Sequence, residues 1–271
     1  MSATTTLSPK AVIFDAYGTL FDVHSVIAAA EQMFPGHGDA LSQLWRQKQI
    51  EYTQLRTLAD SADAAGAHYR PFWDITLDAL RFAAKKLQLS LGRAAEKRLM
   101  DEYACLSAFP DAVPALRQLR EAAPDPAARA GGESAPRPRL AILSNGNPQM
   151  LDIAVKSAGM TRLFDRVLSV DTVRAYKPSP AAYALGTQAF DAQPREIVFV
   201  SSNGWDVAGA TWFGFTTFWL NRQNAPAEEL GVTPHGVGGG MADLLAFLKN
   251  PASSGRSSGA GGSRTRHSPG A

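Results

Sequence analysis

A short apolar run near the start of the chain ends in an aspartate, and this pairing is the clearest chemical signal in the sequence. Val12–Phe14 precede Asp15, and Gly18 then allows the chain to turn sharply. The apolar run predicts a parallel strand that is buried on both faces. Open α/β sheets bind ligands beyond the carboxyl ends of their strands, so Asp15 is a candidate for catalysis.

Three later apolar segments also end in polar residues. These residues are, in chain order, Ser144, Asn145, Lys177, Ser201, Asn203 and Asp206. If the segments are strands of one sheet, their carboxyl ends meet around Asp15. An ammonium group from Lys177 would then keep Asp15 ionised and could pair with a substrate carboxylate.

Each of these motifs also has a purely structural interpretation. Ser144 could cap the next helix, and Asn147-Pro148 suits an N-cap followed by Pro at the first helical position. A single lysine such as Lys177 is most often solvated. The shared order and strand-end placement of the motifs favour the functional interpretation.

Alternating strands and helices predict how these residues are positioned. The further strands are expected at Leu140–Leu143, Val167–Val170, Ile197–Val200 and Thr216–Leu220. Residues 22–106 interrupt the pattern with helical periodicity alone, as in the spacing of Leu41, Leu44, Trp45, Lys48 and Tyr52. The sequence therefore predicts a helical insertion after the first strand, with a loop or extended helix end at Ala59–His68.

Two segments are predicted to carry no chemistry. Residues 122–138 are rich in proline and contain a Gly-Gly pair, which indicates a surface loop insertion. Residues 251–271 are rich in Gly and Ser and are predicted to be a disordered tail.

Several stretches closely resemble the (S)-2-haloacid dehalogenases, also called L-2-haloacid dehalogenases of type II, within the haloacid dehalogenase superfamily. They are Phe14–Ser25, Leu44–Gln49, the turn at Ser144, and Val200–Asp206. The resemblance covers roughly residues 10–248. It implies an α/β fold with a doubly wound, Rossmann-like parallel sheet as the core, over residues 1–21 and 107–250. An all-helical cap subdomain would span residues 22–106.

The resemblance implies hydrolysis of (S)-2-haloalkanoic acids to (R)-2-hydroxyalkanoic acids and halide, with inversion through an aspartyl ester. Most superfamily members are magnesium-dependent phosphatases with a second acid two residues after the first. Tyr17 stands there in this chain, and Asn203 stands where another acid is common. Magnesium prefers carboxylate and water oxygens, so we expect no metal and no other cofactor. A magnesium-dependent small-molecule phosphatase is the alternative.

The resemblance also implies the site residues. The catalytic set is Asp15, Thr19, Arg46, Ser144, Lys177, Tyr183, Ser201, Asn203 and Asp206. The substrate-binding set is Ala16, Tyr17, Arg46, Gln47, Ile50, Phe72, Ser144, Asn145, Lys177 and Trp205. Asp15 would be the nucleophile and Arg46 would receive the halide, while either Asp206 or Lys177 would activate water. Structural alternatives are an i,i+4 surface pair for Arg46 and ordinary packing for Tyr183, Ile50 and Phe72.

Composition limits the other possibilities. The formal charge is +2, and three arginines of the tail account for more than that excess, so nucleic-acid binding is not expected. The single cysteine, Cys105, excludes an intrachain disulfide, and we expect a buried thiol without catalytic function. His24 is expected to be structural. No signal peptide or membrane span is evident, so we expect a cytoplasmic protein, and the resemblance implies a homodimer.

Overall fold

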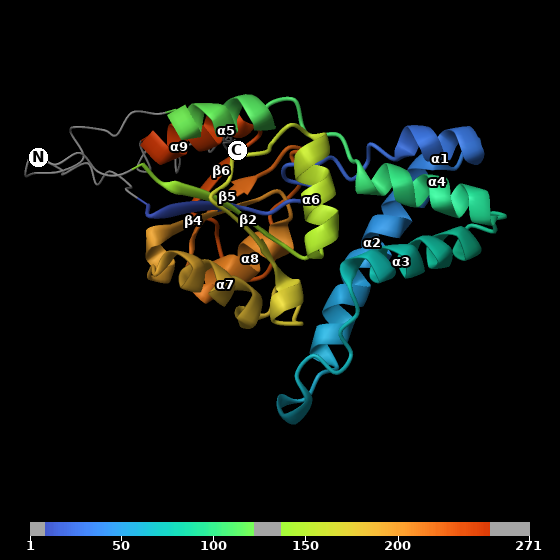
Figure 1. Cartoon of the computed structure of the whole chain (residues 1–271), viewed down its shortest axis with the longest axis horizontal. Coiled ribbons are helices and arrows are strands. Elements are labelled where there is room, and N and C mark those ends of the chain that lie inside the picture. Colours follow the sequence, from blue (N-terminus) through green and yellow to red (C-terminus); the bar gives the residue numbers. More distant parts are fainter. Residues whose placement is uncertain (1–8, 122–136, 250–271) are drawn as a thin grey trace, which may run out of the picture.

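The computed structural model describes residues 9–121 and 137–249, and its centre is a parallel sheet of six strands (Figure 1). The strand order across the sheet is β3-β2-β1-β4-β5-β6. The strands are β1 (Ala11–Phe14), β2 (Arg139–Ser144), β3 (Arg166–Ser169), β4 (Ile197–Ser201), β5 (Thr216–Leu220) and β6 (Gly236–Gly238). The predicted doubly wound α/β core is confirmed. The third strand lies one residue earlier than predicted, and the short β6 was not predicted.

Strand β1 occupies the middle of the sheet, and all four of its residues are fully buried. Phe14 lies beside Ile142 of β2 and Val200 of β4 in the strand register. The strands run in one direction, so the segments that follow these three residues emerge together at the same edge. This edge is where the polar residues predicted from the sequence lie.

Helices cover both faces of the sheet. Alternate side chains of β1 point to opposite faces, and because all of them are apolar, both faces must be covered. Val12 and Phe14 pack in the cluster that includes α5 (Ala112–Glu121), α6 (Pro148–Ser157) and α9 (Met241–Lys249). Ala11 and Ile13 pack in the second cluster, with α7 (Pro180–Phe190) and α8 (Gly204–Phe213). Figure 1 shows α5 and α9 above the sheet and α7 and α8 below it.

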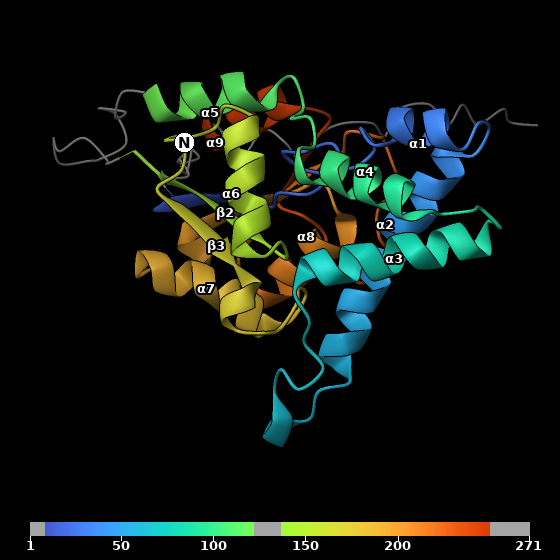
Figure 2. The ribbon, with the colours of Figure 1, turned by 45° about the vertical axis from the view of Figure 1, so that its right-hand side comes forward.

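Four further helices form a layer beside the carboxyl ends of the strands, here called the helical layer. They are α1 (Ile27–Met33), α2 (Gly38–Leu58), α3 (Phe72–Lys86) and α4 (Arg93–Ala104). Figure 2 shows α2 and α3 crossing beside the sheet, with the connection between them extending away from it. This connection corresponds to the predicted loop at 59–68 and contains one short 3-10 turn, Ala62–Ala64.

Hydrogen bonds join α2 and the connection after it to the segment that follows β3. The Tyr69 hydroxyl donates to Asp171 Oδ1 at 2.6 Å. The Tyr176 backbone amide donates to Thr57 Oγ1 at 2.9 Å. These contacts connect residues more than one hundred positions apart in sequence, so they fix the helical layer over the strand ends.

Two side chains outside the site correct or extend the sequence analysis. Cys105 is exposed, so the expected buried thiol is wrong. This residue ends α4, and the chain leaves the helix there without covering the thiol. His24 contacts Ser42 Oγ through Nδ1 at 2.9 Å, in keeping with a structural role.

The predicted loop insertion falls almost wholly outside the described residues, and the predicted tail lies outside them altogether. Within residues 9–121 and 137–249, no helix has both the length and the apolar character needed to cross a membrane.

Candidate active site

Lys177 lies between two carboxylates at the carboxyl edge of the sheet. Its Nζ is 2.9 Å from Asp15 Oδ1 and 2.8 Å from Asp206 Oδ2. All three side chains are buried. Burial favours the neutral amine, but the Asp15 and Asp206 charges outweigh it and raise the pKa of Lys177 above its ordinary value. Lys177 therefore stays an ammonium ion.

Asp206 is held on both carboxylate oxygens. Oδ2 pairs with Lys177, and Oδ1 accepts a hydrogen bond of 2.8 Å from the Tyr183 hydroxyl. Burial raises the pKa of Asp206, Lys177 opposes that rise, and the neighbouring Asp15 charge adds to it. The result is a carboxylate that is more basic than an ordinary aspartate.

Tyr183 combines the two interpretations that the sequence left open. Its hydroxyl donates to Asp206, and its ring packs against Phe199, Phe213 and Phe215. Burial, followed by the charge of Asp206, raises the pKa of Tyr183, so the hydroxyl remains a donor. The aromatic packing fixes the ring that orients Asp206.

The second oxygen of Asp15 is fixed by neutral donors. Oδ2 accepts from Thr19 Oγ1 at 2.8 Å and from Asn203 Nδ2 at 3.0 Å. Thr19 Oγ1 in turn accepts from the Ser202 amide, and Ser201 Oγ accepts from the Asn203 amide. With the Lys177 bond, three of about four lone-pair positions on Asp15 are used, so the carboxylate is oriented and still has a free position.

The turn after β2 forms another side of the site. Ser144 Oγ accepts from the Gly146 amide at 3.0 Å, and Asn145 Oδ1 accepts from the Lys177 amide at 3.0 Å. Ser144 does not cap α6; Asn147 stands at the N-cap position with Pro148 following, as predicted. The Asn147 side chain accepts from the Trp73 amide of α3 instead, which ties this turn to the helical layer.

A small pocket lies between the sheet edge and the helical layer, and it is lined by Asp15 but not by Lys177 or Asp206. The empty space between its walls is about 280 Å³. Its walls consist of Asp15, Tyr17, Arg46, Ile50, Thr53, Phe72, Ser144, Asn145, Asn203 and Trp205. Asp15 is the acid in the wall.

Arg46 supplies the positive charge on the side of the helical layer. It lies on α2, and its Nη2 donates to the Tyr17 carbonyl at 2.9 Å and to Asn203 Oδ1 at 3.1 Å. The guanidinium therefore points into the pocket, and a solvated i,i+4 surface pair does not describe it. Arg46 and Lys177 approach Asp15 from different elements.

Aromatic rings form the apolar part of the wall. The Tyr17 ring packs against Phe72 at 5.5 Å and stacks on Tyr103 at 5.8 Å between centroids. Burial above all raises the pKa of Tyr17, so its phenol stays neutral. Tyr17 thus contributes an apolar surface to the pocket.

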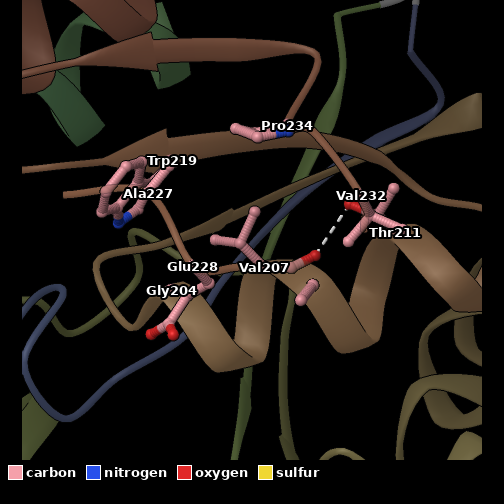
Figure 3. Close-up of a pocket in the computed structure, with 9 residues that line it drawn as sticks. Gly204, Val207, Thr211, Trp219, Ala227, Glu228, Val232 and Pro234 are labelled. Atoms are coloured by element: carbon pink, nitrogen blue, oxygen red, sulfur yellow. Dashed lines mark hydrogen bonds between the residues drawn. The ribbon is translucent and has the colours of Figure 1, made fainter. Parts of the chain in front are cut away.

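A second pocket lies beside α8 and β5 and has different chemistry (Figure 3). Its walls include Val207, Thr211, Trp219 and the exposed Glu228. The Thr211 hydroxyl already donates to the Val207 carbonyl at 2.8 Å. No buried ionised pair faces this space among the described residues, so the Asp15 pocket is the candidate active site.

Metal ligands are not grouped in the part of the chain that the structure describes: no cluster of three or more His, Cys, Asp or Glu side chains is found there. Beside Asp15 the nearest charged partner is the Lys177 ammonium. The donor set around Asp15 therefore differs from the carboxylate-rich set that magnesium prefers.

Comparison with known proteins shows the family of this chain. Residues 9–214 match a family model described as a haloacid dehalogenase-like hydrolase. An (S)-2-haloacid dehalogenase of Pseudomonas sp. (strain YL) is 44% identical, over 83% of this chain and 88% of the relative. The chain belongs to the (S)-2-haloacid dehalogenase family.

Solved structures of L-2-haloacid dehalogenases share the fold. The enzyme RSc1362 is 60% identical, with a TM-score of 0.80 and coverage of 89% of this chain and 99% of that chain. The enzyme of Xanthobacter autotrophicus with chloropropionic acid covalently bound is 36% identical, with a TM-score of 0.74 and coverage of 89% and 98%.

Among the residues expected from the (S)-2-haloacid dehalogenase resemblance, Gln47 does not reach the pocket. Its side chain is exposed, whereas Arg46 and Ile50 line the pocket. Consecutive helix residues point about 100° apart, so Gln47 faces away from the direction of Arg46. Ala16 is buried next to Asp15, but its side chain is not part of the wall.

Three polar residues at this (S)-2-haloacid dehalogenase site were not anticipated. Thr53 lines the pocket, and Gln49 and Tyr103 contact each other behind Arg46 at 3.0 Å. Gln49 and Thr53 follow Arg46 by three and seven residues, which is the spacing of one helix face. That spacing could have identified Gln49 and Thr53 from the sequence.

Proposed function

We propose that this protein hydrolyses (S)-2-haloalkanoic acids to (R)-2-hydroxyalkanoic acids and halide. The observation that carries the proposal is the Asp15 carboxylate, which is fixed by Lys177, Thr19 and Asn203 and faces a small pocket containing Arg46. Family membership and the chloropropionic acid bound covalently in a relative support it.

In the first step, an Asp15 oxygen attacks the halogen-bearing carbon from the side opposite the halogen. A carbon–oxygen bond forms, the carbon–halogen bond breaks, and halide departs with the bonding electrons. The carbon is inverted, and Asp15 becomes an ester. Arg46, with Asn145 and Trp205, stabilises the departing charge.

In the second step, water attacks the carbonyl carbon of the Asp15 ester. The bond between the ester oxygen and the substrate carbon remains intact, so the inversion persists in the hydroxy acid. The bond between the Asp15 carbonyl carbon and the ester oxygen breaks, and the departing oxygen of the hydroxy acid takes up a proton that came from water. Water thus supplies one oxygen to the regenerated carboxylate. We assign acceptance of the water proton to the Asp206–Lys177 pair, because the raised pKa of Asp206 makes it the better base.

The substrate carboxylate is held opposite these groups. Ser144 lines the pocket, and the backbone amides of Ala16 and Tyr17 have no acceptor among the described residues, so all three groups are free to donate to it. Lys177 adds a positive charge beside Asp15. Tyr17, Ile50, Phe72 and Trp205 surround the alkyl group.

The proposal includes neither metal nor other cofactor. The Lys177 ammonium supplies the charge beside Asp15, and a displacement at carbon has no phosphoryl oxygens to neutralise. A magnesium-dependent phosphatase is not favoured, because the neutral phenol of Tyr17 cannot protonate a leaving alcohol as a carboxylic acid would.

Three wider assignments belong to the proposal. Residues 22–106 would act as a cap on a core formed by residues 1–21 and 107–250. Leu55 and Leu58 on α2 are 52% and 81% exposed, which supports a homodimer through the cap. A reducing compartment such as the cytoplasm suits a chain with one cysteine.

The decisive experiment measures halide release from (S)- and (R)-2-chloropropanoate with excess EDTA. The expected result is release from the (S) form alone, with (R)-lactate as product. Release of phosphate from small esters that requires magnesium, without halide release from either enantiomer, would overturn the proposal.

A further inference from the structure

Gln49 is a fully buried amide in the helical layer, directly behind Arg46. Its Oε1 accepts from Arg46 Nη1 at 2.8 Å and from the Tyr103 hydroxyl at 3.0 Å. Its Nε2 donates to Thr76 Oγ1 at 2.6 Å. The side chain is 0% exposed, so no part of the amide is satisfied by bulk water.

The chemistry of its neighbours determines which way the amide points. Arg46 has only donors, so the group facing it must be the Gln49 oxygen. Thr76 donates its own hydroxyl proton to the Phe72 carbonyl at 2.7 Å and therefore accepts from the Gln49 nitrogen. Reversing the amide would place donor against donor at Arg46, so the network has one stable arrangement.

The guanidinium of Arg46 is consequently held from two sides. Gln49 holds Nη1 from the helical layer, while Nη2 reaches Tyr17 O and Asn203 Oδ1 at the sheet edge. Asn203 also donates to Asp15, so the same few bonds relate the plane of Arg46 to the Asp15 carboxylate. The positions of these two groups determine where a halogen and its carbon can stand during displacement.

Packing alone does not account for this residue. Gln49 lies on an otherwise well-packed helix face near Trp45 and Thr53, where a large apolar side chain would fill the space without a polar group to satisfy. Two of its three hydrogen-bond partners, Tyr103 and Thr76, do not line the pocket. The network therefore connects the interior of the helical layer to one pocket residue, Arg46.

We propose that Gln49 is a positioning residue for Arg46, holding the guanidinium plane so that it meets the halide as the halide departs. The inference rests on the proposed role of Arg46 in dehalogenation. It concerns the transition state more than substrate binding, because Arg46 must face charge that develops only as the carbon–halogen bond breaks.

The test replaces Gln49 with methionine, which has nearly the same shape and no acceptor for Arg46. Single-turnover ester formation is measured with (S)-2-chloropropanoate and (S)-2-bromopropanoate. We expect the rate of ester formation from (S)-2-chloropropanoate to fall on the order of tenfold. The rate from (S)-2-bromopropanoate should fall less, and KM should change little for both substrates. Chloride is the poorer leaving group, so it depends more on a well-placed Arg46.

Two variants accompany Gln49→Met. Tyr103→Phe keeps the ring stacked on Tyr17 and removes only the hydroxyl that bonds to Gln49, so a smaller change in the same direction is expected. Ser42→Ala removes another buried hydroxyl of the same helix, one that contacts His24, and should leave both rates unchanged. Melting temperatures show that each variant is folded at the assay temperature.

Inhibition by free bromide provides a readout apart from turnover. Gln49→Met should weaken it several-fold, since a loosely held guanidinium binds the product halide less well. Unchanged rates and unchanged bromide inhibition in folded Gln49→Met would overturn the inference, as would equal losses with both halogens. Absence of halide release by the unmodified protein would instead refute the proposed function.

Discussion

Lys177 and Asp206 form a buried ion pair in which Nζ lies 2.8 Å from Oδ2 and neither side chain is more than 1% exposed. Lys177 contacts Asp15 with the same ammonium group, so it stands between the proposed nucleophile and the proposed base. The ammonium charge of Lys177 opposes the rise that burial causes in the pKa of Asp206.

Replacing Asp206 with Asn tests the division of labour in this arrangement. The amide keeps the shape of the side chain but cannot accept the water proton, so ester hydrolysis should slow by about 10²–10⁴-fold, the usual contribution of a general base. Ester formation at Asp15 should be affected less. Intact-mass spectrometry after mixing with (S)-2-chloropropanoate should then detect a protein heavier by one propanoate group.

Asp22→Asn is the matched control for that experiment, since the Asp22 carboxylate accepts from the His24 amide and does not line the pocket. It should turn over normally and accumulate no heavier species. If Asp206→Asn lost turnover without an adduct, Asp206 would be needed for ester formation and the assignment of the base would be wrong.

The nucleophilic role of Asp15 predicts the fate of the water oxygen. A single turnover in water enriched in oxygen-18 should label the Asp15 carboxylate and leave the hydroxy acid unlabelled, because the substrate carbon receives its oxygen from Asp15. Peptide mass spectrometry locates the label. Asp15→Asn should lower turnover by at least about 10⁴-fold, as expected when a nucleophile is removed. Label in the product alone would mean that water attacks the substrate directly.

The raised pKa of Lys177 predicts how stability depends on alkaline pH. Burial lowers this pKa, but the charges of Asp15 and Asp206 raise it by more, so the pKa lies above its ordinary value of 10.5. A group whose folded-state pKa is raised stabilises the fold fully below the unfolded value, and the stabilisation is lost as pH rises through the folded value. Melting temperature should therefore fall above about pH 10.5, beyond the general alkaline loss.

Lys177→Met isolates this contribution. The variant lacks the titrating group, so its melting temperature should depend less on pH between about pH 10 and 12 than that of the unmodified protein. The variant should nevertheless be less stable at neutral pH. If the melting temperatures of the two proteins fell equally with pH over that range, the ion pairs of Lys177 would not control alkaline stability.

The sequence predicted that four polar residues would lie together at the edge of the sheet. Asp15, Lys177, Asn203 and Asp206 each follow an apolar run, and parallel strands bring such positions to one edge whatever the details of the loops. Ser144 was identified in the same way, whereas Thr19 was assigned only through the family resemblance.

The helical layer was less predictable in detail because a helix surface does not reveal which face is covered. Gln47 and Gln49 have the same side chain two residues apart, yet the first is exposed and the second fully buried. Helical spacing separates their faces, but only the packing of α2 on α3 shows that the face of Gln49 is the covered one. Tyr103 could not be assigned for a similar reason, since its contact with Tyr17 joins residues on separate elements.

The wall of the pocket predicts how chain-length preference can be changed. Ile50 lines the alkyl side of the pocket, while Gln47, less than one turn earlier, faces solvent. Ile50→Ala enlarges the cavity by about three carbon atoms, and a methylene in an apolar pocket alters discrimination by about 1–3 kcal/mol. We expect the ratio of kcat/KM for (S)-2-chlorobutanoate to that for (S)-2-chloropropanoate to rise about tenfold. Gln47→Ala should leave the ratio unchanged; a shift in Gln47→Ala as large as that in Ile50→Ala would show that the helical layer rearranges around substrate.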